Sequence, residues 1–240
     1  MELWIERLLG SSREDQECVE QLLGASSRHR QYGAGQILQF DDDRLDVLYA
    51  LNAGWVGISR DLEDGSEQTV DFFLPGQIVG LRQLASPDTM ICFKALSDIE
   101  VTLINRQGLH AAMNKVPRLN NLILSQIALE ESWMMERLTT LGQRSAAQCV
   151  LHFLLETKYR IDRAAPGKKS GVDVEVPISQ EQMGAILATT PVHISRVLQE
   201  LRAKNLLENA GSGWNFPDQS AAEAYCEFDA ARLGMDTTAR

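Results

Sequence analysis

The 240-residue sequence lacks long apolar runs, paired cysteines and a leader-like beginning. No stretch approaches the roughly eighteen consecutive apolar residues of a membrane-spanning helix, so we expect no membrane association. The opening segment MELWIERLLGSSREDQE carries acids inside its apolar stretch and has no basic start, which argues against a signal peptide. We therefore expect a cytoplasmic protein.

The four cysteines, Cys18, Cys92, Cys149 and Cys226, lie far apart in the chain. None forms a CxxC pair, and none has metal-ligand spacing with a histidine. Free and mostly buried thiols are the ordinary interpretation of such a pattern. A thiol switch at Cys92, which lies in an apolar stretch typical of a strand, is the alternative that stays open.

The sequence also lacks the residue patterns of common enzymes. It contains no nucleophile–base arrangement, no metal motif and no phosphate-binding loop, since PGQIVG is too short and has no lysine. We therefore expect neither enzymatic activity nor a bound metal or cofactor.

An overall positive charge, which would favour nucleic-acid binding, is absent because the net charge is −10. The acids are unevenly placed, however. Residues 1–112 contain 9 basic and 18 acidic side chains, residues 113–216 contain 12 and 10, and residues 217–240 contain 2 and 5. The mildly basic middle part leaves room for nucleic-acid binding by the later half of the chain.

Between residues 30 and 105, short apolar segments alternate with Gly, Asp and Pro. This spacing predicts several short strands and hence a small antiparallel sandwich or barrel. A hairpin is predicted at DLEDGSE, because Asp64-Gly65 supplies a turn. The strand candidates are residues 35–40, 46–51, 55–60, 67–74, 76–81, 90–96 and 99–104.

The pattern is helical over residues 1–28 and again after Asn105. Pro117 is expected to begin a long helix of about 25 residues, because proline is favoured in the first turn. Its one apolar stripe predicts packing on its own domain or pairing with a second copy, and we favour pairing. Gly142 is expected to end it, ahead of an amphipathic helix over residues 143–160. The stripe consists of Leu119, Leu122, Ile123, Ile127, Met134, Leu138 and Leu141.

Two short helices are predicted within ISQEQMGAILATTPVHISRVLQELRAKNLL. Ser179 is an N-cap candidate for the first, Thr190 caps the second, and Pro191 takes the first helical position. The second helix would bury one face and expose Pro191, Val192, His193, Arg196 and Gln199. A hairpin predicted over residues 206–216, with its turn at Gly211–Gly213, would make this a winged helix-turn-helix.

The order of these elements resembles the Crp/Fnr family of bacterial transcription regulators over about residues 15–216. The stretches SQEQMGAILATTPVHISRVLQELRAKNLL and LPGQIVG carry the resemblance. It implies an α+β protein with an N-terminal jelly-roll β-barrel like a cyclic-nucleotide-binding domain, a long dimerisation helix and a C-terminal winged helix-turn-helix. The expected divisions are residues 1–112 for the β-roll sensor, 113–142 for the dimerisation helix, 143–216 for the DNA-binding domain and 217–240 for a tail.

The resemblance also implies roles for individual residues. Arg196 stands where the family has an arginine that contacts guanine O6 and N7. Pro191 and Val192 replace the usual Arg-Glu pair, and Val192 is suited only to pack on a thymine methyl group. Ser179, Thr190 and His193 fall where the family contacts phosphates, which set register rather than sequence.

Members of the family that bind cyclic AMP carry Gly-Glu-Leu after the Pro-Gly turn of the roll and an Arg-Ser pair further on. Here Leu81 and Arg82 follow Gly80, and Thr89 and Met90 stand where the Arg-Ser pair would align. Without that arginine a cyclic phosphate loses its charge-assisted partner, so we expect an effector other than cyclic AMP.

Other sensor chemistries of the family are also weakly supported. An iron–sulfur cluster needs several cysteines near the N-terminus, where Cys18 stands alone. A haem would need an axial ligand such as His29, His110 or His152, and each is more often an ordinary histidine. An unidentified small molecule, the thiol switch at Cys92 and the absence of any effector all stay open.

The resemblance implies a homodimer whose two second helices enter successive major grooves of a palindromic double-stranded DNA site. It implies an effector in the roll that moves a hinge near Leu141-Gly142, and RNA polymerase as a further partner. The rival hypothesis is a ligand- or partner-binding module whose helix-turn-helix no longer reads DNA. Arg196 and the basic loop at Lys168-Lys169 argue against that rival.

Overall fold

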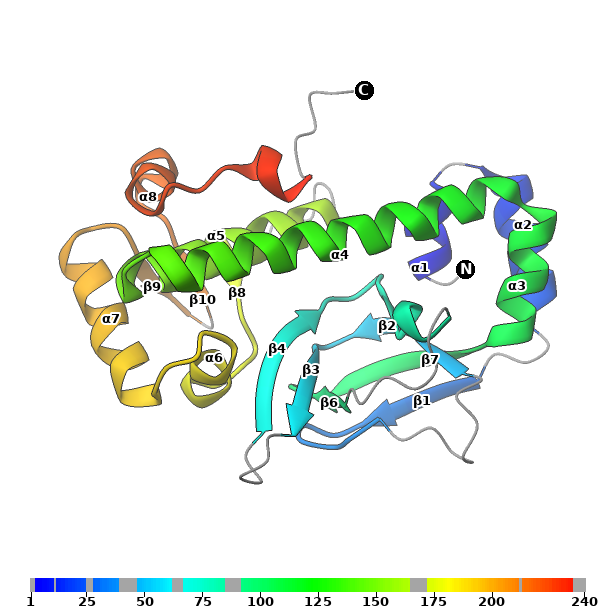
Figure 1. Cartoon of the computed structure of the whole chain (residues 1–240), viewed down its shortest axis with the longest axis horizontal. Coiled ribbons are helices and arrows are strands. Elements are labelled where there is room, and N and C mark those ends of the chain that lie inside the picture. Colours follow the sequence, from blue (N-terminus) through cyan, green and yellow to red (C-terminus); the bar gives the residue numbers. More distant parts are fainter. Residues whose placement is uncertain are drawn as a thin grey trace. The chain divides into compact units, whose positions relative to one another are not determined.

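The structure, a computed structural model, forms two compact units, Met1–Ala128 and Leu129–Arg240. They are joined within one continuous helix, α4 (Pro117–Gln143), shown in green in Figure 1. The described residues are 3–10, 12–24, 28–38, 47–61, 67–84, 92–164, 172–211 and 213–234.

Two antiparallel sheets form the roll of the first unit, one with strand order β1-β7-β2-β5 and one with order β4-β3-β6 (Figure 1). Side chains of both sheets meet in one buried apolar cluster that includes Tyr49, Phe73 and Phe93. The strands are β1 (Arg28–Tyr32), β2 (Val47–Ala53), β3 (Val56–Asp61), β4 (Glu67–Phe73), β5 (Ile78–Val79), β6 (Cys92–Ala95) and β7 (Ile99–Asn105), and a 3-10 turn, η1 (Leu81–Leu84), follows β5.

Strand β1 is the element of the roll that the apolar pattern failed to predict. Its sequence RHRQY has no alternation of apolar and polar residues, because among the described strands β1 lies at the edge of its sheet, next to β7. Conversely, the segment 35–40 contributes only an isolated bridge between Ile37 and Lys94 among its described residues. The turn predicted at Asp64-Gly65 lies outside the described residues, although β3 and β4 pair as a hairpin requires.

Three helices cover the roll: α1 (Leu3–Leu9), α2 (Arg13–Gly24) and α3 (Arg106–Lys115). Their apolar faces meet the β2–β7 sheet and the start of α4 in a second cluster, which contains Trp4, Leu109 and Ile123. The long helix begins at Pro117, as the sequence predicted, so the expected division at residue 113 falls within α3. Residues 113–115 belong to α3, whose C-cap is Val116, and Pro117 starts the next helix.

The second unit contains the rest of α4, α5 (Ala146–Ala164), two short helices, a small sheet and a C-terminal segment. Buried Leu154, Ile194 and Leu201 belong to its core. The sheet has strand order β8-β10-β9. The elements are β8 (Val174–Glu175), α6 (Gln180–Ile186), α7 (Pro191–Ala203), β9 (Glu208–Ala210), β10 (Gly213–Asn215), α8 (Gln219–Cys226) and a 3-10 turn, η2 (Ala230–Leu233).

Helix α4 ends one residue after Gly142, where the sequence predicted its end, and a two-residue connection leads to α5. The helix continues to Gln143, and the amide of Arg144 still donates to the carbonyl of Thr140 over 3.1 Å. A single glycine weakens a helix by only about 1 kcal/mol, which neighbouring contacts can offset. The architecture of roll, long helix and winged helix-turn-helix otherwise agrees with the sequence prediction.

Candidate nucleic-acid interface

Helices α6 and α7 form the helix-turn-helix, and each begins at a side-chain cap. Ser179 accepts a hydrogen bond from the amide of Gln182, and the Gln182 side chain accepts one from the amide of Ser179, which completes a capping box. Thr190 accepts from the amide of His193, and Pro191 follows at the first helical position. Both predicted caps are thereby confirmed.

The turn between the helices is tight and carries backbone strain. Ala188 has φ 51°, in the left-handed region, and the amide of Thr189 donates back to the carbonyl of Gly184 over 2.8 Å. A Cβ at Gly184 would lie 2.7 Å from the Thr189 carbonyl oxygen. Because Gly184 has no side chain, the backbone of this turn can approach α6 closely.

Helix α7 divides cleanly into a buried face and an exposed face. Ile194, Val197, Leu198 and Leu201 are buried in the unit. Val192 is 63% exposed, which is unusual for a large apolar side chain and leaves it free to contact a partner. The six predicted contact residues, Ser179, Thr190, Pro191, Val192, His193 and Arg196, are all exposed.

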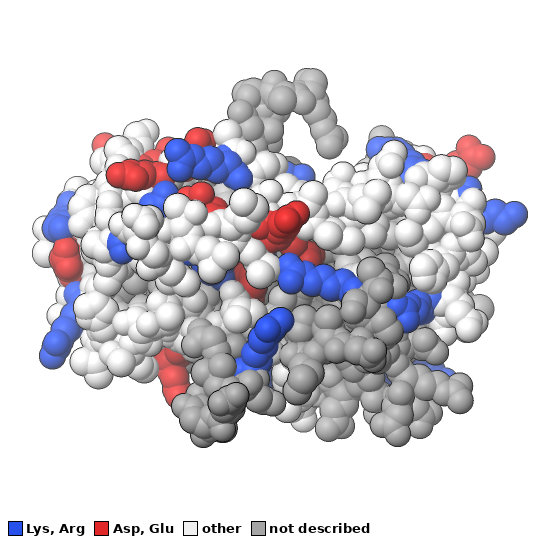
Figure 2. Space-filling model, viewed as in Figure 1, with Lys and Arg blue, Asp and Glu red and all other residues white. Residues whose placement is uncertain are grey.

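Two contacts that the sequence did not reveal join the end of α7 to the wing and to α8. Arg202 donates to Asn209 of β9 over 3.0 Å, and Lys204 donates to Glu200 and to the Tyr225 hydroxyl, each over 2.8 Å. On the face seen in Figure 2, basic side chains are interspersed with acidic ones around α7 and α8, near the left edge. Arg202 and Asn209 are 7 residues apart, and Lys204 and Tyr225 are 21 residues apart. Helical periodicity therefore does not signal either contact.

Two known domain families match the chain. The cyclic nucleotide-binding domain matches residues 29–116, and the Crp-like helix-turn-helix domain matches residues 149–221. The chain belongs to the Crp/Fnr family of transcription regulators. Its helix-turn-helix is therefore that of a DNA-binding transcription regulator.

Several curated relatives of this Crp/Fnr regulator carry regulatory names. The transcriptional activator protein FnrL of Cereibacter sphaeroides is 26% identical over 191 residues, which are 76% of this chain and 73% of FnrL. The transcriptional regulatory protein btr of Bordetella pertussis is 27% identical over 173 residues, 72% of this chain and 70% of btr. The structure of FixK2 from Bradyrhizobium japonicum has the same fold, with a TM-score of 0.71 and 23% identity, and the match covers 82% of this chain and 96% of FixK2.

In the sensor unit of the Crp/Fnr regulator, Leu81 is 2% exposed and packs in the cluster beneath the N-terminal helices. It therefore offers no polar group where cyclic-AMP-binding members have glutamate. Arg82 is exposed on η1, and Thr89 and Met90 lie outside the described residues. Within the part of the chain that is described, no three His, Cys, Asp or Glu side chains gather as metal ligands, and no helix is long and apolar enough to cross a membrane.

The cysteines and histidines of the chain differ in burial. Burial raises the pKa of the Cys226 thiol to about 12 and also raises that of Cys149. Both thiols therefore stay protonated and unreactive at neutral pH. Cys92 is half-buried on β6, opposite Ser59, and its role as a thiol switch stays a prediction. His29 and His110 are exposed, whereas His152 is buried.

Proposed function

We propose that this Crp/Fnr regulator acts as a homodimer on palindromic DNA, with the two α7 helices in successive major grooves about one helical turn apart. The exposed face of α7 carries the proposal. Its first turn presents Pro191, Val192 and His193, and Arg196 follows one turn later, while the opposite face is buried. N-terminal residues of the second helix are the ones that reach base edges in this geometry.

The base contacts follow from side-chain chemistry. Arg196 reads guanine through two parallel hydrogen bonds, and Val192 packs on a thymine methyl group. Pro191 has no donor to offer a base. Ser179, Thr190 and His193 contact phosphates; the two capping hydroxyls still have a proton to donate while they accept from the helix.

An exposed face of α4 supports the proposed dimer. Leu124, Met135 and Leu138 are 63%, 63% and 69% exposed, although they are large and apolar. With exposed Ala128 and Glu131 they follow each other at alternating steps of four and three residues, the heptad spacing of a paired helix. Of the seven residues of the predicted stripe, only Leu138 and Leu141 are exposed. Leu119 and Ile123 are buried against the roll, and Leu122 and Ile127 pack on the same cluster.

The effector, if the roll binds one, differs from cyclic AMP. Buried Leu81 supports this proposal, and so does the replacement of the Arg-Ser pair by Thr89 and Met90 in the sequence. Addition of cyclic AMP should leave the midpoint of thermal unfolding unchanged. A concentration-dependent rise of that midpoint would overturn this part of the proposal.

The test of the proposed function is selection of bound duplexes from a random-sequence library, with the wild type, Arg196→Ala and Arg13→Ala in parallel. Arg13→Ala is the matched control, because it removes one exposed positive charge from α2, outside the helix-turn-helix. We expect a palindrome with a guanine in each half, which Arg196→Ala loses and Arg13→Ala keeps. Guanine recognition should be weakened by about 1–3 kcal/mol in Arg196→Ala.

The rival hypothesis predicts a different outcome. A module that no longer reads DNA would recover no common motif, and Arg196→Ala would bind the same duplexes as the wild type. Its binding would also lack the steep decrease with salt that phosphate contacts produce.

A further inference from the structure

The C-terminal segment Glu227–Gly234 lies beyond the matched helix-turn-helix domain, which ends at residue 221. The sequence predicted a C-terminal tail over residues 217–240, which includes this segment. Instead, Leu233 is fully buried, and the segment packs on α4 and α5 of its own unit.

One end of the segment is attached to the second half of α4 and to the end of α5. The indole Nε1 of Trp133 donates to the carbonyl of Leu233 over 3.1 Å, and Arg163 donates to the carbonyl of Gly234 over 2.8 Å. Gly234 has φ 63° and fits so closely that an added Cβ would lie 2.6 Å from the Leu129 side chain. Leu129 and Trp133 belong to α4, and Arg163 belongs to α5.

The other end of the segment covers the joint between α4 and α5. The Phe228 ring lies 5.0 Å from the ring of His152 and 5.1 Å from that of Tyr159, both on α5. Arg144, in the two-residue connection between the helices, donates to the carbonyl of Glu227 over 3.2 Å. The segment therefore contacts α4, α5 and the connection between them.

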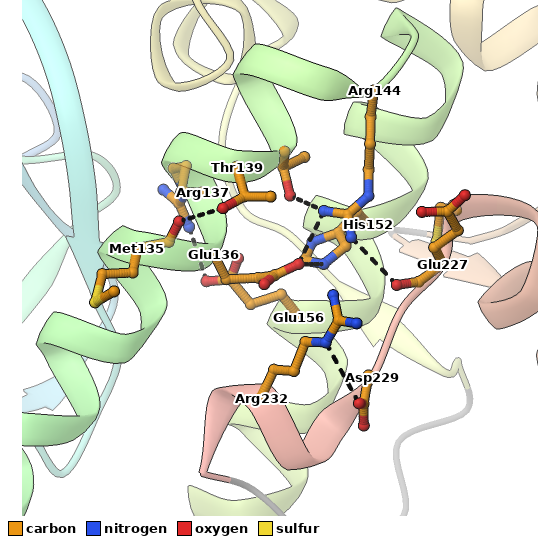
Figure 3. A network of polar contacts seen from close by, with 12 residues as sticks. Met135, Glu136, Arg137, Thr139, Arg144, His152, Glu156, Glu227, Asp229 and Arg232 are labelled. Atoms are coloured by element: carbon orange, nitrogen blue, oxygen red, sulfur yellow. Dashed lines mark hydrogen bonds and ion pairs between the residues drawn. The ribbon is translucent and has the colours of Figure 1, made fainter.

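A buried ionic cluster joins α4 to α5 beneath this segment (Figure 3). Glu156 of α5 accepts from Arg137 of α4 over 2.7 Å and from Arg160 over 3.0 Å. Arg144 donates to Glu136 of α4 over 2.9 Å. Figure 3 shows Arg144 and His152 directed at Glu136, with Glu227 beside them.

Such a cluster sets the relative orientation of α4 and α5 more than it adds to the free energy of unfolding. Removing these charges from water is costly, and the cost is recovered only when every partner lies at hydrogen-bonding distance. A bend between α4 and α5 would separate Arg137 from Glu156 and leave buried charges without their partners. The arrangement therefore favours one angle between the two helices.

This angle determines where the DNA-binding helix lies relative to the dimer stripe. The stripe is on α4, whereas α7 packs against α5. We propose that the segment Glu227–Gly234, together with the buried ionic cluster, is a positioning device that holds the α4–α5 joint rigid and so fixes the two α7 helices at one separation. The inference rests on the proposed dimer. It replaces the hinge expected near Leu141-Gly142 with a locked joint.

The test measures the distance between the two α7 helices directly, without DNA. A spin label is attached at Ala203→Cys, at the exposed end of α7, with Cys18 and Cys92 replaced by serine and the buried Cys149 and Cys226 retained. Pulsed dipolar spectroscopy then reports the distance between the labels of the two protomers. We expect one narrow distance distribution for the otherwise unchanged protein.

Three variants remove the device to different extents: a chain that ends at Glu227, Phe228→Ala, and Trp133→Phe, which deletes the hydrogen bond to Leu233 and reduces the aromatic surface on which Arg160 lies. Each should lose the single narrow distance while sedimentation shows an intact dimer and circular dichroism shows native helix content. Trp214→Phe on β10 is the matched control, because it makes the same exchange in the same unit, and it should keep the narrow distance. If the shortened chain fails to fold, Trp133→Phe decides the result.

DNA binding provides a second measurement. If the segment only stabilised the fold, its loss would affect single half-sites and full palindromes alike. The variants should bind a duplex with a single half-site as tightly as the wild type does. Their affinity for the full palindrome should decrease roughly tenfold or more, because a loosely held second α7 has a lower effective concentration at the second half-site. A narrow distance that survives in the folded, shortened dimer would overturn the inference, and so would a broad distance in the wild type. A monomeric wild type, with no dipolar signal, would instead overturn the proposed dimer and this inference with it.

Discussion

The hydroxyl groups of Ser179 and Thr190 show how single residues serve fold and proposed function together. Each accepts a hydrogen bond from a helix amide, and each remains exposed at the surface that we propose faces DNA. A hydroxyl has one proton and two lone pairs, so capping does not use its donor. The same atom is therefore available for a phosphate oxygen.

Thr190→Ala should reduce both stability and DNA affinity. Loss of an N-cap costs about 1 kcal/mol of unfolding free energy, and loss of the phosphate contact weakens binding to all sequences alike. Denaturant unfolding and duplex binding measure the two effects. Thr190→Ser keeps the hydroxyl and should retain both, so an equal loss in Thr190→Ser would contradict the assignment.

Val192→Glu should change the sequence preference of the protein rather than its fold. The side chain is 63% exposed, so the carboxylate remains solvated in the free protein. Glutamate accepts a hydrogen bond from cytosine N4, whereas valine packs on a thymine methyl group. Selection from a random library should therefore show a thymine replaced by cytosine in each half-site. Val192→Ala should only weaken the thymine preference, and an unchanged motif in Val192→Glu would place this residue away from the bases.

At the scale of elements, α4 carries one residue that opposes its proposed pairing. Glu131 is exposed and lies midway along the stripe between Leu124 and Leu138. In a twofold-symmetric pair the two Glu131 side chains face each other, and a polar residue at such a position specifies register at a cost in stability. The stripe therefore favours a dimer of moderate rather than maximal affinity.

Glu131→Leu should tighten the dimer. Removal of the two facing charges and extension of the apolar stripe should lower the dissociation constant roughly tenfold, which corresponds to about 1.4 kcal/mol. Sedimentation over a range of concentrations measures the change. Glu14→Leu places the same apolar side chain on α2, and its dissociation constant should equal that of the wild type. A weaker dimer in Glu131→Leu would show that the helices pair through another face.

The elements also show which patterns in the sequence are reliable. Helices α4 and α7 were predicted close to their observed bounds, because their apolar spacing extends over several turns and Pro117 and Thr190 mark their beginnings. Strand β1 was missed because an edge strand needs no apolar alternation. The break predicted at Gly142 differs by one residue from the end of α4 at Gln143, because glycine weakens a helix without forbidding it.

At the scale of the whole molecule, the buried charges make the stability of the second unit depend on pH. Burial lowers the pKa of His152 below its ordinary value of 6.5; Glu156 and Glu136 oppose this shift, whereas Arg144 and Arg137 reinforce it. Burial alone would raise the pKa of Glu156, but Arg137 and Arg160 lower it below 4.5. In both cases the unfolded chain binds the proton more readily than the folded chain does.

Stability should therefore decrease as the pH falls below 6.5, and decrease further below 4.5. The slope contributed by His152 approaches about 1.4 kcal/mol per pH unit between its unfolded and folded pKa values. Denaturant unfolding from pH 7.5 to 5 measures it. His152→Asn should flatten the curve in this range, whereas His110→Asn, which changes an exposed histidine, should not. A curve unaltered by His152→Asn would contradict the assignment.

The sequence by itself determined the order of roll, long helix and winged helix-turn-helix, and it identified the exposed face of α7. These features depend on residues a few positions apart, through helical spacing, strand alternation and capping side chains. The tertiary structure decided the rest. Glu156 and Arg137 are 19 residues apart, and Leu233 and Trp133 are 100 apart. No local pattern signals such pairs, because burial of a charge or a chain end depends on which distant surfaces the folded chain brings together.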